Sequence, residues 1–312
     1  MTLRFLRFID LPENKGKGGF DHAHIHHAHN RLYVAHTCND AVDVIDLATD
    51  QYLFSIPNLA GVAGALVSDT HDLVFTSNRA ENTLGVFAAN DSPTVTKIGV
   101  GVKPNGLSYD PVRNRVLSAH VGDPDVPSSY TVSLVDVAAQ KRIADIPVAG
   151  RTRWTVFDPQ TDAHYVNIAD PAQIAVIDAK HPTQVARTFA IPVAGPHGLD
   201  LDAENRRLFC ACDGGQLVCV DIHTGAITQT STLSGVPDVI FFDAALRHLH
   251  VAIGEPGLIE VFDTTTMTCV QRVQTELGAH TFALDMQRHK VYVFLPQSHR
   301  AAVYEDRAMN LQ

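Results

Sequence analysis

The stretch GPHGLDLDAENRRLFCAC, residues 195–212, contains a short apolar strand that ends in an aspartate, then a polar turn and a second apolar strand. The same frame returns along the chain, and its second strand recurs about every 41 to 48 residues, which is the period of a four-stranded propeller blade. The repeat therefore predicts an all-β fold, a seven-bladed β-propeller with four-stranded blades. The blades are expected to start near residues 20, 62, 105, 153, 197, 238 and 280.

Two columns of acidic residues support this repeat. One column ends the first strand of a copy, and the other ends its third strand. Apolar and polar residues alternate at period two, and the turns are rich in Asp, Asn, Gly and Pro, as is typical of strands joined by tight turns. The first column is Asp110, Asp158, Asp202, Asp243 and Asp285, and the second is Asp46, Asp136, Asp178, Asp221, Asp263 and Glu305.

The last copy has only three strands before the chain ends beyond Glu305. The segment TLRFLRFID, residues 2–10, alternates like a strand and has no blade of its own. Pairing these two ends would remove two unpaired sheet edges, which otherwise invite aggregation. We therefore expect residues 2–10 to supply the fourth strand of blade seven and to close the ring.

The order Pro, any residue, Gly, an apolar pair, Asp, a turn and a strand resembles the YVTN-type repeat of YncE-like seven-bladed propellers. The resemblance covers nearly the whole chain and implies the same architecture. It implies no single activity, because similar propellers include hydrolytic lactonases, a metal-dependent streptogramin lyase and proteins that only bind. Departures from the pattern include His22 and Trp154, which replace the glycine, and His26, which replaces the turn aspartate.

Composition limits the classes of partner. The formal net charge is −10 and no run of residues is basic, which argues against nucleic-acid binding. No apolar run approaches the ~18 residues of a membrane span, and the N-terminus does not read as a signal peptide. We expect a single propeller domain over residues 1–312, in the cytoplasm, with a small-molecule ligand as its partner. Motifs for serine hydrolysis, phosphate binding and dinucleotide binding are absent from the sequence.

The inner strands of a propeller surround a central channel and all begin at the same face. The residue just before each predicted inner strand is polar or charged in six of seven copies, whereas the following alternate positions are apolar. A polar rim over an apolar wall is typical of a ligand pocket. These rim positions are Asp21, Val62, Asn105, Arg153, His197, Asp238 and His280.

Histidines are expected to gather at this face. His36 and His120 end the second strands of blades one and three, and return to the side of the rim. Imidazole is the commonest protein ligand of transition metals, and three ligands with an open position make a catalytic site. We therefore expect a divalent or transition metal ion as cofactor. Its candidate ligands are His22, His24, His36, His197, His280 and Asp21.

Each candidate has a structural alternative. The rim histidines could bind only channel water, and His36 and His120 could be buried structural groups. The run His26, His27 and His29 falls in a turn at the opposite face, where we expect adventitious surface histidines. Arg153 could form an internal ion pair with Asp21 or Asp238, or its planar fork could hold a carboxylate.

These residues suggest a metal-dependent enzyme, a lactonase-type hydrolase or a lyase, that acts on a small anionic substrate at the top of the channel. His120 or Asp238 would serve as the general base, and the metal would polarise a carbonyl or activate water. The alternatives are a non-catalytic scaffold for a peptide or metabolite, and a protein of metal storage or delivery. The expected substrate-binding residues are Arg153, Trp154, Asn105 and Arg79.

Overall fold

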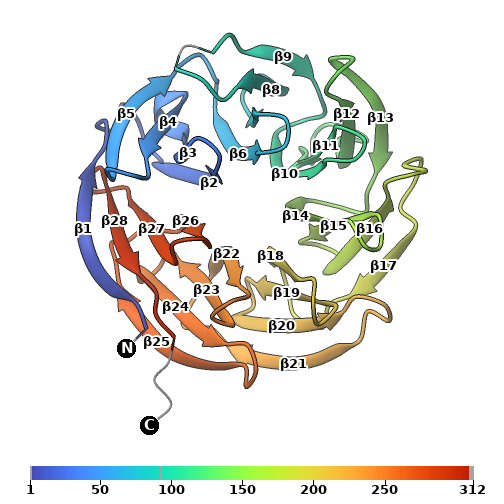
Figure 1. Ribbon diagram of the computed structural model, residues 1–312. Helices are drawn as coiled ribbons and strands as arrows, with labels where there is room; N and C mark the ends of the chain where they lie inside the picture. The colour runs from blue at the N-terminus through green and yellow to red at the C-terminus, as the bar shows by residue number, and fades with distance from the viewer. Residues whose placement is uncertain (1, 92, 309–312) are drawn as a thin grey trace.

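The computed structural model describes residues 2–91 and 93–308 of the chain. It contains seven four-stranded sheets, which stand as blades around a central channel (Figure 1). The predicted seven-bladed β-propeller is confirmed. Outside the strands, the described residues form one short 3-10 helix, η1 (Thr37–Asn39). No helix in this part of the chain has the length and apolar character needed to cross a bilayer.

The first four blades follow each other directly along the chain. Blade one consists of β2 (Phe20–His26), β3 (Arg31–His36), β4 (Ala41–Asp46) and β5 (Gln51–Ile56). Blade two consists of β6 (Val62–Ser68), β7 (Leu73–Asn78), β8 (Thr83–Ala88) and β9 (Thr96–Gly99). Blade three consists of β10 (Pro104–Asp110), β11 (Arg115–His120), β12 (Thr131–Asp136) and β13 (Lys141–Pro147). Blade four consists of β14 (Thr152–Asp158), β15 (Ala163–Ile168), β16 (Gln173–Asp178) and β17 (Arg187–Ala190).

The last three blades include the joint between the chain ends. Blade five consists of β18 (Pro196–Asp202), β19 (Arg207–Cys212), β20 (Gln216–Asp221) and β21 (Ile227–Thr232). Blade six consists of β22 (Pro237–Asp243), β23 (His248–Ile253), β24 (Leu258–Asp263) and β25 (Thr268–Gln274). Blade seven consists of β26 (Phe282–Asp285), β27 (Lys290–Leu295), β28 (Arg300–Glu305) and β1 (Arg4–Asp10).

Blade seven confirms the predicted closure of the ring. Strand β1 pairs antiparallel with β28, with Arg4 opposite Glu305 and Asp10 opposite Arg300. The two strands lie side by side at the outer edge of the ring (Figure 1). Ile9 is only 3% exposed and lies in the cluster between blades seven and one. The N-terminal strand therefore supplies both a hydrogen-bonding ladder and part of the core.

The first acidic column caps the turns between first and second strands. Asp110 accepts hydrogen bonds from the backbone N–H groups of Val112 and Arg113, at 3.0 and 3.1 Å. The equivalent aspartates of blades four to seven each accept the N–H three residues further on. These side chains satisfy turn donors that no strand partner can reach, which explains why the column recurs.

The sequence suggested that the rim residues precede the inner strands. This holds for His280, whereas the other rim residues lie within their strands. Asp21, Asn105, Arg153, His197 and Asp238 are each the second residue of their strand. In each of these five strands the pairing register shifts across this position. Such irregularities bend a strand and redirect a side chain. The shift explains how a residue that is already within the sheet comes to line the top of the channel.

The third residue of an inner strand lies against the neighbouring blade. A Cβ atom on Gly106 would come 2.4 Å from the carbonyl oxygen of Arg153, and one on Gly198 would come 2.4 Å from that of Asp238. Contacts this short are not tolerated, so glycine allows the two inner strands to approach. The same position carries His22 in blade one and Trp154 in blade four. Both departures from glycine matter for the site.

Candidate functional site

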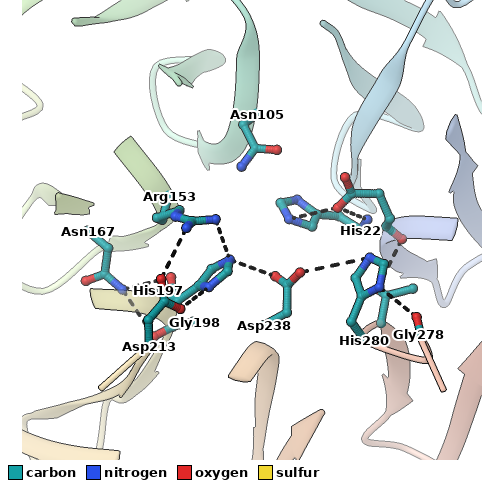
Figure 2. A network of polar contacts seen from close by, with 12 residues as sticks. His22, Asn105, Arg153, Asn167, His197, Gly198, Asp213, Asp238, Gly278 and His280 are labelled. Carbon is teal, nitrogen blue, oxygen red and sulfur yellow. Dashed lines mark hydrogen bonds and ion pairs between the residues drawn. The ribbon is translucent and has the colours of Figure 1, made fainter. Parts of the chain in front are cut away.

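A polar cavity of about 240 Å³ lies at the channel rim. Seven blades contribute through the starts of their inner strands or the loops beside them, and side chains converge from opposite sides of the ring (Figure 2). Eight of the twelve predicted site residues line it, together with two that were not predicted. The predicted ones are Asp21, His22, Arg79, Asn105, Arg153, His197, Asp238 and His280, and the additional ones are Val121 and Arg151.

His197 is the centre of the polar network (Figure 2). Its Nδ1 lies 2.7 Å from Oδ1 of Asp213, and its Nε2 lies 3.2 Å from Oδ1 of Asp238 and 3.0 Å from Nη1 of Arg153. Arg153 also donates to Oδ2 of Asp213 across 3.2 Å. Both ring nitrogens are therefore already committed to neighbouring side chains.

These contacts keep His197 charged. Burial opposes protonation, but the carboxylates of Asp238 and Asp213 outweigh it and raise the pKa of His197 to about 9, against the smaller opposing effect of Arg153. Asp238 responds in the opposite sense: burial would raise its pKa, whereas His197, His280 and His22 together lower that pKa below its usual range. At neutral pH the two groups form an imidazolium–carboxylate pair, and the proton on Nε2 points at Asp238.

His280 faces the other side of Asp238 with a different protonation pattern. Its Nδ1 lies 2.8 Å from the carbonyl oxygen of Gly278, which can only accept a hydrogen bond, so Nδ1 carries a proton. In the neutral ring Nε2 is then unprotonated, and it lies 3.9 Å from Oδ2 of Asp238. The His280 side chain is 35% exposed, which makes this nitrogen accessible to a ligand.

Three arginines give the cavity its cationic character. Arg79 contacts Asn105 and lies 3.3 Å from Oδ2 of Asp21. Arg151, at the mouth, is exposed and makes no ion pair with the residues that the structure describes. The Nε atoms of Arg79 and Arg153 are buried and have no hydrogen-bond partner among those residues. Buried N–H donors are normally hydrogen-bonded, so a ligand or a water molecule is expected to accept a hydrogen bond from each Nε–H group.

His22 lines the cavity and, with Trp154 beneath it, forms the channel floor. These two replacements of the glycine position meet across the channel, with ring centroids 4.1 Å apart, and Phe241 contacts the indole edge-on at 5.9 Å. Trp154 does not line the rim cavity itself. Burial, the largest influence, lowers the pKa of His22, so its ring is neutral where it stacks. The sequence pattern located these departures, but their contact arises only in the folded ring.

Two larger cavities, of about 440 and 480 Å³, lie below this floor and open at the turn face. His24 lines both of them rather than the rim, and burial lowers its pKa to about 4. Asp200 also lines both; burial raises its pKa to about 7, against the N–H groups of Leu201 and Phe242. Their walls are mainly apolar, and the ionic groups of the rim are separated from them by Trp154.

The expectation that His36 and His120 reach the rim is not met. His36 is fully buried, with Nδ1 at 2.7 Å from Asp43 and Nε2 at 2.8 Å from Asn14. His120 is also fully buried and contacts Oγ1 of Thr131 at 2.9 Å. Burial lowers the pKa of His120 to about 4. Both residues end second strands, one strand removed from the channel, and neither lines the cavity.

The predicted metal ligands do not fit together as a site. His36 lies within blade one, His24 lies below the floor, and both nitrogens of His197 are occupied. Among the residues that the structure describes, one group of three ligand atoms lies within 4.8 Å of one another, and it is at the opposite face. That group consists of His26, His29 and Asp72.

No protein-family model matches the chain, and no curated protein matches it either. The geometry of the rim therefore carries the functional argument. Besides Val121, two polar contributors to the rim network were not among the predicted site residues. Arg151 precedes its strand and carries no repeat signal, whereas Asp213 follows the second strand of blade five and could have been found from its place beside His197.

Proposed function

We propose that the rim cavity binds a small organic anion, with a carboxylate group held by Arg153. The observation that carries this proposal is the gathering of Arg79, Arg151, Arg153 and protonated His197 around one small cavity. Partly buried guanidinium groups recognise carboxylates through paired, charge-assisted hydrogen bonds. A volume of about 240 Å³ is equivalent to roughly eight water-sized groups of about 30 Å³, which suits a small mono- or dicarboxylate.

The family and the cellular location that we propose for the protein follow from its sequence. We assign the chain to the YncE-like propellers with YVTN-type repeats, on the pattern of its blades. We place it in the cytoplasm, where its five free cysteines would stay reduced. The ligand would enter from solvent at the rim, because Trp154 closes the cavity from below.

The pH dependence of binding tests the anion site. The pKa of His197 is raised from 6.5 to about 9, so its ion pairs stabilise the fold fully below pH 6.5 and are lost as the pH rises through 9. Anion affinity is expected to stay constant from pH 7 to 8 and to fall roughly tenfold by pH 10, the strength of one charged hydrogen bond. Calorimetric titration with lactate, succinate and citrate measures this, with lactamide and succinamide as neutral controls. Equal binding of acids and amides would contradict the proposal.

A catalytic role is a second candidate, favoured by the two imidazoles that flank Asp238. In its neutral form, His280 would offer an unprotonated Nε2, and His197 carries a proton on its Nε2, so the pair could act as base and acid in a hydrolase or lyase reaction. We expect turnover of a lactone or hydroxy-acid panel to fall at least 100-fold in His280→Gln. Anion affinity should change by less than about threefold in that variant. A loss of affinity equal to the loss of turnover would assign His280 to binding alone.

A further inference from the structure

The turn between β2 and β3 holds a second cluster of ionisable side chains, at the face opposite the rim. Strand β2 runs from the rim at Asp21 to His26, about 16 Å at 3.3 Å per residue. His26 ends the strand, and His29 follows in the turn. Asp72 comes from the equivalent turn of blade two, between β6 and β7. The cluster therefore spans the seam between two blades.

The ligand atoms of this cluster are already close together. Oδ1 of Asp72 lies 3.4 Å from Nε2 of His26 and 3.3 Å from Nε2 of His29, and the two imidazole centroids are 4.6 Å apart. One atom from each residue lies within 4.8 Å of the others. Two imidazoles and a carboxylate are a donor set suited to Zn²⁺ and to other late first-row cations.

His26 provides an independent indication of a ligand. Its side chain is 0% exposed, and its Nε2 is buried without a hydrogen-bond partner, although it faces the other two residues. Its Nδ1 accepts the backbone N–H of His29 at 3.3 Å, the same turn cap that an aspartate makes in other blades. The aspartates at this position in other blades also bind a cationic side chain, as Asp158 does with Arg206 and Asp285 does with Arg288. A histidine that caps the turn with one nitrogen has a second nitrogen left over.

Asp69 contacts the other ring nitrogen of His26, Nδ1. Its Oδ1 lies 3.1 Å from Nδ1 of His26 and accepts the N–H of Ala28 at 3.3 Å. While Nδ1 accepts the His29 N–H, the proton of the neutral ring is on Nε2. A metal on Nε2 requires that proton to move to Nδ1, which gives up the hydrogen bond from His29, and Asp69 is in place to accept the Nδ1 proton instead. Carboxylates that hold a ligating histidine in this way fix its tautomer and orientation.

Arginine–carboxylate bridges join blades at this face, including the seam between blades one and two, where Arg31 pairs with Asp91. Arg113 of blade three grips Asp162 of blade four with two hydrogen bonds of 2.6 and 2.7 Å, and Arg206 of blade five contacts Asp158 of blade four. At the seam between blades one and two, the imidazoles of His26 and His29 also face the carboxylates of Asp69 and Asp72.

We propose that His26, His29 and Asp72 form a binding site for one late first-row divalent cation, such as Zn²⁺, which joins blades one and two. The site is separate from the anion cavity, because strand β2 and the channel floor lie between them. It has a solvent-facing side: the side chains of His29 and Asp72 are 45% and 64% exposed. Water therefore completes the coordination, and the metal can enter without any opening of the fold.

Calorimetric titration of the full chain, made without a His-tag and freed of metal with a chelator, tests the site with Zn²⁺. We expect one Zn²⁺ per chain, and an affinity at least about 100-fold lower in His29→Ala and in Asp72→Asn, since loss of an outer-shell partner alone costs 10–100-fold. Asn is the chosen replacement because Asp72 has a φ of 51°, which asparagine tolerates. Asp69→Asn should weaken binding by about tenfold.

His27→Ala is the matched control. His27 belongs to the same histidine run, but its Nδ1 points toward Asp285 of blade seven at 3.9 Å, and we expect unchanged Zn²⁺ affinity. Zn²⁺ should also raise the melting temperature of the parent and of His27→Ala but not of His29→Ala, since ligands that bind only the folded state stabilise it. Undiminished binding in His29→Ala and Asp72→Asn would overturn the proposal, as would a parent chain that binds no Zn²⁺.

Discussion

Removal of residues 1–11 is expected to lower the free energy of unfolding by about 5 kcal/mol or more, because Leu3, Ile9 and Leu11 are each worth roughly 1.5–3 kcal/mol when buried. The deletion also removes the ladder between β1 and β28 and leaves the outer edge of β28 unpaired. Urea unfolding followed by circular dichroism measures the change. Solubility should fall with it, since the exposed edge can pair between molecules.

Two point variants in β1 distinguish the loss of a buried side chain from a substitution at an exposed position of the same strand. Ile9 is 3% exposed and Phe8 is 51% exposed, on opposite faces of β1. Ile9→Ala should cost about 2–5 kcal/mol, whereas Phe8→Ala should cost less than about 1 kcal/mol. A truncated chain that unfolds at the same urea concentration as the parent would show that β1 does not close the ring in solution.

Arg153→Lys is expected to reduce anion affinity by about tenfold or more, while the free energy of unfolding changes by less than about 1 kcal/mol. Lysine keeps the positive charge but loses the planar fork. Arg153 also pairs with Asp213, and lysine keeps a positive charge opposite that carboxylate. Titration with succinate at pH 7.5 measures the affinity, and urea unfolding measures the stability.

Arg113→Lys is the matched control for this substitution. Arg113 makes the same kind of fork to Asp162, but it does so at the turn face, where it joins blades three and four. We expect a loss of stability in this variant with unchanged anion affinity. If Arg153→Lys behaves in the same way, Arg153 is a structural residue, and the anion site loses its central group.

The sequence located most of the rim because the rim is tied to the repeat. Each inner strand starts at an equivalent place, so counting from the turn aspartate finds Arg153, His197 and Asp238 without any knowledge of contacts. The same counting failed for His36 and His120. They share a repeat position, but that position is on the second strand, where the side chains turn into the blade. The periodicity assigns a residue to a strand and to one end of that strand. It does not show whether the side chain points into the channel.

The histidine run shows the same limit of the sequence pattern. Here the pattern failed to predict a cluster that the folded chain forms. From the sequence, His26 was one of several surface histidines near a turn. Its burial, its free Nε2 and its contact with Asp72 depend on blade two, whose turn lies more than forty residues away. Nothing in the local pattern specifies which two turns face each other across a seam.

The sequence by itself determined the number of blades, the closing strand and most of the positions whose side chains line the rim cavity. Strand alternation and turn capping are local interactions, so they repeat visibly along the chain. The tertiary structure alone decided that His22 stacks on Trp154, that His197 is held between Asp213 and Asp238, and that His26 meets Asp72. These contacts depend on how neighbouring blades are rotated and on the register shifts at the start of the inner strands. Such geometry is a property of the assembled ring, because each blade alone has no partner across the channel or across a seam.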